Sequence, residues 1–175
     1  MHLIKTVLFF LFFFFFSAHA EPRTVPLVDL SQYVGRWYQI SANPTPYQAG
    51  CFCAQQTLTA MSDGNVGVYN SCNVGAVDGK LTEIRGTASA VDKKTNAKLE
   101  VDFNMPWKGE YWIVGLAVDY TWAVVTDSKG ESLYILSRAP TMSPEAYNGA
   151  MAAAQAASVD TSKLVMQTQL GCSYP

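Results

Sequence analysis

Histidine is nearly absent from this chain, and both copies fall within its first 20 residues. His2 and His19 are the only two histidines among 175 residues. Residues 21–175 therefore cannot form a Ser-His-Asp or Cys-His catalytic site, a zinc site with histidine ligands, or a histidine pH switch. This absence excludes the mechanisms of many hydrolases and zinc enzymes.

Positive charge is scarce as well. Residues 21–175 contain 11 of the 12 Lys and Arg residues and all 14 Asp and Glu residues, so their net charge is −3. No run of basic residues occurs in this segment. Proteins that bind nucleic acid usually present a basic patch that neutralises phosphates. We therefore expect no nucleic-acid partner.

The longest apolar run lies close to the N-terminus. Lys5 precedes apolar residues 7–16, and the small-residue segment 17–20 follows them. This order of residues is typical of a secretory signal peptide that is cleaved after Ala20. We expect residues 1–20 to be this signal peptide and residues 21–175 to fold as one exported domain. No later apolar run reaches the ~20 residues that span a bilayer, so any membrane or lipid contact would be transient.

Four cysteines follow the predicted signal peptide, at Cys51, Cys53, Cys72 and Cys172. An even number of cysteines in an exported chain predicts disulfides, and four cysteines allow three pairings. The C-x-C spacing of the first two is too short for the usual zinc motif, and no second C-x-C follows. We expect two disulfides, no metal site and no other cofactor.

Short segments rich in Val, Ile, Thr, Tyr and Trp alternate with turn signals such as Asp63-Gly64 through most of residues 21–175. This spacing is typical of an antiparallel sandwich or barrel. The pattern predicts eight strands, at 36–42, 52–61, 66–73, 81–91, 97–105, 111–118, 121–126 and 131–138. Pro44 and Pro46 bar a regular strand between the first two segments, so a loop is expected there.

The sixth and seventh predicted strands are apolar on both faces, so they need cover outside as well as inside. Ser143-Pro144-Glu145 combines an N-cap, a proline at the first helical position and an acid in the first turn. Small and apolar residues then recur at helical spacing. We expect a helix over 144–157 on the outside of this region, and a last short strand at 163–170.

Three motifs lie in register with these elements. Gly35-Arg36-Trp37 opens the first strand, Val118-Asp119-Tyr120 joins the sixth and seventh, and Leu136-Ser137-Arg138 ends the eighth. Across essentially all of residues 21–175, this layout resembles the lipocalins, most of all the branch of apolipoprotein D and the bacterial lipocalins. Val118 stands where that family often has Thr. The resemblance implies an all-β fold, an eight-stranded antiparallel up-and-down barrel with one external C-terminal helix.

The resemblance also implies structural roles for the motif residues. Trp37 closes one end of the barrel, and the guanidinium of Arg138 stacks across it in a cation–π contact with backbone hydrogen bonds. Gly35 lets the chain pass this stack without a Cβ. Asp119 and Tyr120 form a turn. We expect Gly35, Trp37 and Arg138 to hold the fold and to touch no ligand.

A barrel of eight strands has room for one small ligand. By similarity to the family, the inward faces of its strands line the cavity, and small residues at Gly86 and Ala88 widen it. The expected ligand-binding residues are Leu99, Val101, Phe103, Tyr111, Ile113, Ala123, Val125, Ser132, Tyr134 and Leu136. Alternatively, these side chains simply fill a core. This uncharged lining suits an elongated hydrophobic or amphipathic ligand, of fatty acid, lysolipid, retinoid or pigment type.

Three functions are therefore compared. The sequence favours a secreted, extracellular protein that carries a small hydrophobic ligand. The alternative is a secreted protein–protein interaction or inhibitor module, which Tyr47 and Phe52 at the barrel mouth could serve. Some lipocalins are enzymes, one of them through a cysteine inside the barrel. Here the cysteines fit disulfides and Asp119 is a turn residue, so we do not expect an enzyme. The oligomeric state is left open.

Two arguments about the disulfides disagree. A hairpin turn at Asp63-Gly64 would bring Cys53 near Cys72 and leave Cys51 for Cys172. In the apolipoprotein D branch, however, a cysteine 11 residues before the turn glycine bonds the C-terminal segment. That resemblance implies the pairs Cys53–Cys172 and Cys51–Cys72. We favour the second arrangement, because a β-bulge easily shifts the register of a hairpin.

Overall fold

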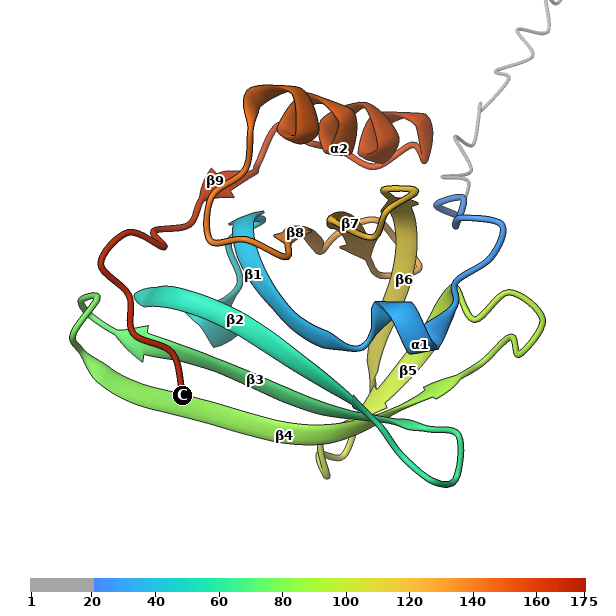
Figure 1. The fold of residues 1–175 in the computed structure, drawn as a ribbon, viewed down its shortest axis with the longest axis horizontal. Helices are drawn as coiled ribbons and strands as arrows, with labels where there is room; N and C mark the ends of the chain where they lie inside the picture. Colours follow the sequence, from blue (N-terminus) through green and yellow to red (C-terminus); the bar gives the residue numbers. More distant parts are fainter. Residues whose placement is uncertain (1–20) are drawn as a thin grey trace, which may run out of the picture.

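The computed structural model describes residues 21–175, and its strands form one antiparallel barrel with a helix packed against one side (Figure 1). The predicted signal peptide, residues 1–20, lies outside the described residues. In chain order, the elements are α1 (Leu30–Tyr33), β1 (Gly35–Ala42), the 3₁₀ turn η1 (Pro46–Gln48), β2 (Cys51–Ala60), β3 (Val66–Val74), β4 (Lys80–Ala90), β5 (Lys98–Asp102), β6 (Gly109–Leu116), β7 (Trp122–Thr126), β8 (Leu133–Ser137), α2 (Pro144–Ala156) and β9 (Val165–Met166).

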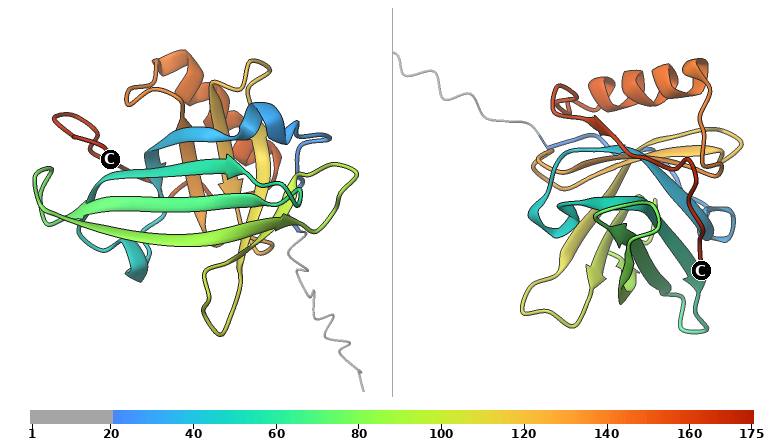
Figure 2. Two further views of the ribbon diagram at one scale, coloured as in Figure 1. Left: turned by 60° about the horizontal axis from the view of Figure 1, so that its bottom comes forward. Right: turned by 90° about the vertical axis from the view of Figure 1, so that its left-hand side faces the viewer.

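The barrel closes because β1 pairs with two strands at once. The start of β1 pairs with β2, with Gly35 opposite Leu58, and the rest of it pairs with β8, with Tyr38 opposite Ser137. Each strand from β2 to β7 pairs with the next strand in sequence. The predicted eight-stranded up-and-down barrel is confirmed. Figure 2 shows it from the side and from the end.

Most strand boundaries lie within two residues of the predicted ones, but two segments differ. The fifth strand was expected over 97–105 and ends at Asp102, because the Asp102 carboxylate accepts a hydrogen bond from the Asn104 amide and Asn104 has a φ of 56°. The last strand was expected over 163–170, but only Val165–Met166 pairs with β1. Beyond it, the side chain of Gln169 donates to backbone carbonyls of the barrel in place of a regular ladder.

Helix α2 covers the apolar outer faces of β6 and β7, as expected. The Ser143 hydroxyl accepts a hydrogen bond from the Ala146 amide and so caps the first turn. Ala150 and Ala154 are fully buried in a cluster that also contains Val124. The small residues let the helix approach the sheet closely. Among residues 21–175, no helix is long and apolar enough to cross a membrane.

The Arg138 guanidinium lies over the Trp37 ring, with its central carbon 3.7 Å from the ring centroid. Trp37 is completely buried. The guanidinium also donates hydrogen bonds to the backbone carbonyls of Gln32, Tyr33, Arg36 and Tyr120. One side chain thus joins the lead-in helix, β1 and the turn between β6 and β7, which is the structural role that the resemblance implied.

Gly35 and the 119–120 turn surround this stack. Gly35 has a φ of +105°, and a Cβ at this position would lie 3.0 Å from an Arg138 nitrogen. In the turn, the Asp119 carboxylate accepts hydrogen bonds from the amide and hydroxyl of Thr121. The Tyr120 hydroxyl accepts one from the Asp29 amide. These motif residues therefore make structural contacts at the closed end of the barrel.

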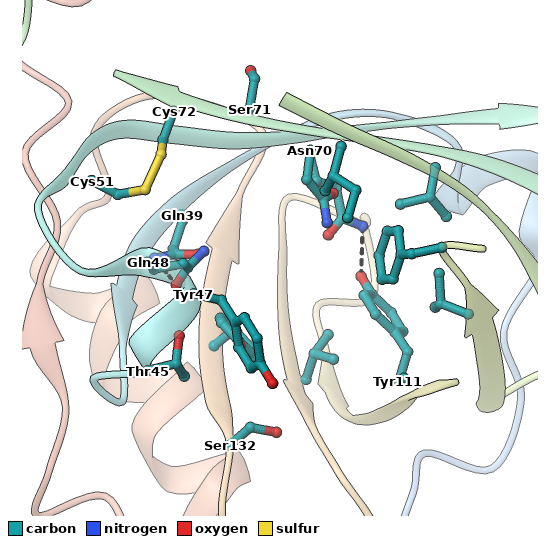
Figure 3. Close-up of a pocket in the computed structure, with 18 of the residues that line it drawn as sticks. Gln39, Thr45, Tyr47, Gln48, Cys51, Asn70, Ser71, Cys72, Tyr111 and Ser132 are labelled. Carbon is teal, nitrogen blue, oxygen red and sulfur yellow. Dashed lines mark hydrogen bonds between the residues drawn. A yellow bond between two sulfur atoms is a disulfide. The ribbon is translucent and has the colours of Figure 1, made fainter. Parts of the chain in front are cut away.

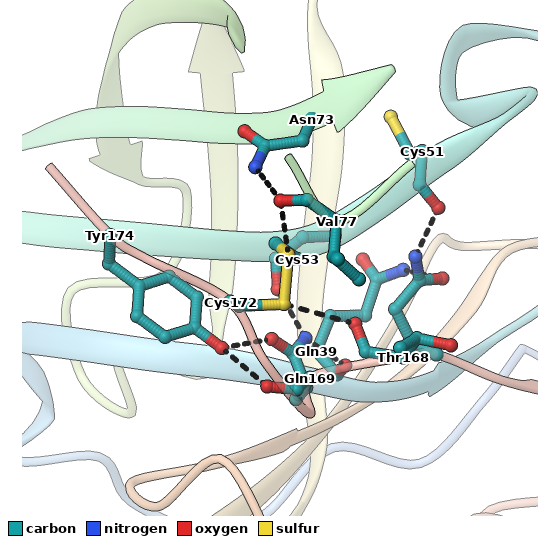
Figure 4. Close-up of a disulfide and its surroundings, with 11 residues drawn as sticks. Gln39, Cys51, Cys53, Asn73, Val77, Thr168, Gln169, Cys172 and Tyr174 are labelled. Carbon is teal, nitrogen blue, oxygen red and sulfur yellow. Dashed lines mark hydrogen bonds between the residues drawn. A yellow bond between two sulfur atoms is a disulfide. The ribbon is translucent and has the colours of Figure 1, made fainter. Parts of the chain in front are cut away.

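The disulfides join Cys51 to Cys72 and Cys53 to Cys172. Figure 4 shows the second of them and its surroundings. The hairpin argument was wrong because β2 is irregular between Phe52 and Gln55. Cys53 has a φ of 56° at this irregularity, and its amide donates to the Thr168 carbonyl of the C-terminal segment. The bulge therefore places Cys53 against the tail, which gives the pairing that the resemblance implied.

Replacing Arg138 tests the closed-end stack. We expect Arg138→Ala to lower the free energy of unfolding by about 1–3 kcal/mol, because it removes the cation–π contact and several charged hydrogen bonds. Urea unfolding measures this loss. Arg85→Ala is the matched control, because Arg85 lies over the half-buried Tyr69 ring and its side chain is 69 % exposed. A loss no larger than that of the control would contradict the assigned role.

Removing each disulfide tests the pairing and its contribution to stability. The loop closed by Cys53–Cys172 spans 119 residues and that of Cys51–Cys72 spans 21. In the chain-entropy model, losing the first costs about 4–5 kcal/mol and losing the second about 3 kcal/mol. Urea unfolding of Cys53→Ala/Cys172→Ala and Cys51→Ala/Cys72→Ala measures both. Peptide mapping without reduction, with cleavage at Phe52, would refute the pairing by finding Cys53 linked to Cys72.

Candidate functional site

A cavity of about 560 Å³ occupies the half of the barrel away from the Trp37 stack. Figure 3 looks into it. Strands β1 to β8 and the loops at this end of the barrel supply its lining. The lining residues are Gln39, Thr45, Tyr47, Gln48, Cys51, Gln55, Gln56, Val68, Asn70, Ser71, Cys72, Thr82, Glu83, Ile84, Val101, Phe103, Met105, Trp107, Gly109, Glu110, Tyr111, Val125, Ser132, Tyr134 and Leu136.

Seven of the ten predicted ligand-binding residues line this cavity. They are Val101, Phe103, Tyr111, Val125, Ser132, Tyr134 and Leu136. The other three, Leu99, Ile113 and Ala123, lie in the packed core, with exposed fractions of 2 %, 0 % and 0 %. Each of them lies opposite a lining residue in the sheet (Leu99 opposite Tyr111, Ile113 opposite Val125, Ala123 opposite Leu136), but its side chain packs in the buried cluster that contains Trp37. These three side chains therefore fill the core, which was the alternative to lining a cavity.

The small residues on β4 do not widen the cavity as expected. Ala88 is buried in the core. At Gly86, a Cβ would lie 2.7 Å from the Phe103 ring and 2.6 Å from the Asp102 carbonyl oxygen. The missing side chain of Gly86 thus makes room for the aromatic ring of Phe103. Phe103 itself lies just beyond β5, on the side of the cavity nearest the mouth.

β1, β2 and β3 provide a polar wall of the cavity that was not predicted from the sequence. Gln56 and Asn70 lie opposite each other on β2 and β3 and both line the cavity. The alternation of side chains along β3 could have predicted this position, because Asn70 lies on the same inward face as Val66 and Val68. The ten predicted ligand-binding residues include none from β1, β2 or β3, so the carboxamides of Gln56 and Asn70 were not among them.

A hydrogen-bonded chain of phenols and one carboxamide forms part of the cavity floor. The Gln56 side chain donates to the Tyr111 hydroxyl at 2.9 Å, a bond that ends at the labelled Tyr111 in Figure 3. This hydroxyl also lies 2.9 Å from that of Tyr33. Tyr33 is 1 % exposed and comes from α1. Burial raises the pKa of Tyr33 and the pKa of Tyr111 above the usual value of a phenol. Both groups are therefore neutral at physiological pH.

The loop between β1 and β2 forms one side of the mouth. Gln48 and Gln39 exchange side-chain hydrogen bonds, at 3.0 and 3.3 Å. Tyr47 stands beside the opening and is 80 % exposed (Figure 3). Tyr47 thus lies at the mouth as expected, whereas Phe52 is not among the residues that line the cavity.

The two acidic residues of the lining have partners outside the cavity. Glu83 accepts a hydrogen bond from the Tyr69 hydroxyl, and Glu110 accepts two from Ser128. Within residues 21–175, no three His, Cys, Asp or Glu side chains come close enough together to hold a metal ion. Besides these two carboxylates, the described cavity offers apolar, amide and hydroxyl groups, whose chemistry suits reversible binding.

Comparison with known proteins agrees with this architecture. A family model described as a lipocalin-like domain matches residues 28–169. The outer membrane lipoprotein Blc of Escherichia coli K12 is 30 % identical over 158 residues, which cover 89 % of each chain. Temperature-induced lipocalin-1 of Arabidopsis thaliana is 31 % identical (82 % of this chain, 81 % of that protein), and rat apolipoprotein D is 30 % identical (82 % and 78 %).

Solved structures show the same fold. Insecticyanin of the tobacco hornworm Manduca sexta superposes with a TM-score of 0.69 at 20 % identity, covering 89 % of this chain and 88 % of that one. Lobster apocrustacyanin A1 superposes with a TM-score of 0.64 at 18 % identity, covering 87 % and 93 %. At these identities the likeness concerns the fold alone.

Tyr111→Phe tests the hydrogen-bonded floor. We expect it to lower the free energy of unfolding by about 1–2 kcal/mol, because the hydroxyl of Tyr33 and the amide of Gln56 lose a buried partner. Thermal and urea unfolding measure the change. Tyr69→Phe is the control, since it removes a hydroxyl from an exposed hydrogen bond. Equal losses in the two variants would contradict a stabilising role for the floor.

Proposed function

The chain belongs to the lipocalin family, and from this premise we propose that it is a secreted carrier of one small hydrophobic or amphipathic molecule. Members of this family bind small hydrophobic ligands. The observation that carries the proposal is the cavity of about 560 Å³, which lies within the usual size range of small-molecule sites. Its wall of Val101, Phe103, Val125 and Leu136 offers apolar contact to such a ligand.

The size of the apolar wall sets the affinity that we expect. Burying roughly 300 Å² of apolar ligand surface at ~25 cal/mol per Å² contributes about 7 kcal/mol before the entropic cost of association. By itself this contribution corresponds to a dissociation constant of roughly 10 μM, and the entropic cost makes binding weaker than that. Tighter binding requires polar contacts to a specific ligand.

Secretion and the absence of catalysis belong to the same proposal. Two disulfides favour an oxidising compartment, which agrees with the predicted signal peptide over residues 1–20. All four cysteines form disulfides, so none of them supplies the free thiol that a cysteine enzyme needs. The carboxylate of Asp119 is held in its turn by hydrogen bonds from Thr121. These observations support a binding protein over an enzyme.

A second candidate function is recognition of another protein through the barrel mouth. The observation that favours it is the exposure of aromatic side chains there, 80 % for Tyr47 and 56 % for Trp107. The two functions are separated by native mass spectrometry of protein purified from its own secretions. A bound small molecule supports carriage, and an empty barrel bound to a protein supports the second candidate.

Charged substitutions in the cavity test the carrier proposal. We expect Phe103→Asp and Tyr134→Asp to abolish binding of an apolar fluorescent probe while the protein stays folded, because each places a charge in the cavity. Quenching of tryptophan fluorescence by the probe measures binding, and circular dichroism checks the fold.

Val118→Asp is the matched control, since Val118 is fully exposed in the turn at the opposite end of the barrel. This variant should bind the probe as the original protein does. If a broad panel of apolar probes produces neither quenching nor a thermal shift in the original protein, the carrier proposal fails.

A further inference from the structure

The hydrogen-bonding groups deep in the cavity gather on one side of its floor. Gln56 on β2 and Asn70 on β3 face each other, and Tyr111 on β6 joins them through the hydrogen bond from Gln56 (Figure 3). Below this level lies the packed apolar core around Leu58 and Ile113. The cavity therefore has a polar patch of uncharged groups at its inner end, made by Gln56, Asn70 and Tyr111.

One atom of this polar patch has no partner. The side-chain oxygen of Asn70 is buried and accepts no hydrogen bond from residues 21–175. A buried acceptor without a partner costs free energy, and a hydrogen-bond donor placed in the cavity would recover it. The polar patch is thus suited to a ligand group that donates a hydrogen bond.

The described cavity offers no positive charge to a ligand. None of its lining residues is Lys, Arg or His. Lys108, in a loop near the mouth, is bonded to Glu100 at 2.6 Å. Arg138 lies against Trp37 at the closed end and is bonded to four backbone carbonyls. A carboxylate or phosphate buried in this cavity would therefore lack a cationic partner.

A positively charged ligand group also lacks a partner at the floor. The carboxylates of Glu83 and Glu110 belong to the lining, but they accept hydrogen bonds from Tyr69 and Ser128, and neither carboxylate is bonded to the polar patch. The pKa of Tyr111 is raised by burial, so its hydroxyl does not supply a negative charge. Burying an ionised group without a partner is far more costly than burying a hydroxyl that finds one.

We propose that the ligand is an uncharged amphipathic molecule, and that a hydroxyl or similar neutral donor of it binds Gln56, Asn70 and Tyr111 at the cavity floor. Its apolar part then extends toward the mouth along Val101 and Phe103. This inference rests on the proposed carrier function and narrows it. Among the ligand types considered above, it favours alcohols and disfavours fatty acids in their ionised form.

Three ligands that share the same alkyl chain length and differ in their end group test the proposal. Dodecanol, dodecanoate and dodecylamine compete with the neutral fluorophore N-phenyl-1-naphthylamine at pH 7.5. We expect dodecanol to bind at least about tenfold more tightly than the two charged ligands. At pH 4 most of the acid is neutral, because the pKa of a carboxyl group lies slightly above this pH. The affinity of the acid should then approach that of the alcohol, which serves as the internal reference.

Two substitutions of Asn70 test whether the polar patch causes the preference for dodecanol over the charged ligands. Asn70→Leu should reduce the preference for dodecanol over dodecanoate at least about threefold. Asn70→Lys should reverse the preference, because it supplies the missing cation. Thr57→Val is the matched control, since it removes a hydroxyl from the outer face of the strand that holds Gln56, and it should leave the preference unchanged.

The outcomes separate this proposal from the carrier function. If the fluorophore and all three ligands fail to bind, the carrier function fails. If dodecanoate or dodecylamine binds as tightly as dodecanol at pH 7.5, the ligand is carried but the uncharged-floor proposal is overturned. It is overturned as well if dodecanol binds best but Asn70→Leu and Asn70→Lys, both folded by circular dichroism, leave the preference unchanged.

Discussion

The guanidinium of Arg138 is the group on which the closed end of the barrel depends. It lies 3.7 Å from the centroid of the Trp37 ring and donates to carbonyls from α1, β1 and the turn before β7. The turn is distant in sequence from α1 and β1, and no regular ladder joins it to them at this point. A planar group with several fixed donors can satisfy such carbonyls together, whereas a lysine could not. The closed end is thereby sealed without a further strand.

This closed end also shapes the binding cavity. The carbonyl of Tyr33 accepts hydrogen bonds from Arg138 and from the indole of Trp37, and its hydroxyl lies against that of Tyr111. Tyr111 in turn accepts the hydrogen bond from Gln56. A residue of the lead-in helix thus connects the structural stack with the floor of the cavity. The polar patch is held in place by the same contacts that close the barrel.

Local patterns were sufficient to predict the architecture. Alternating apolar residues and turn signals indicated eight strands, the Ser143-Pro144 cap indicated α2, and the doubly apolar strands β6 and β7 indicated where that helix packs. Such features depend on residues close together in sequence. The resemblance in three short motifs added the closed-end stack. The disulfide pairing also agrees with the resemblance, whereas the hairpin argument failed because it took β2 to be regular through Cys53.

The sequence by itself thus determined the barrel, its external helix and the inward face of β4 to β8, because strand periodicity is local. Only the tertiary structure decided which inward residues line the cavity and which fill the core. Leu99, Ile113 and Ala123 have the same parity as the lining but are packed in the buried cluster that contains Trp37. Gln56, Asn70 and Tyr111 come together from β2, β3 and β6. Their meeting depends on strand register and on the β2 bulge, which are set by contacts between distant segments.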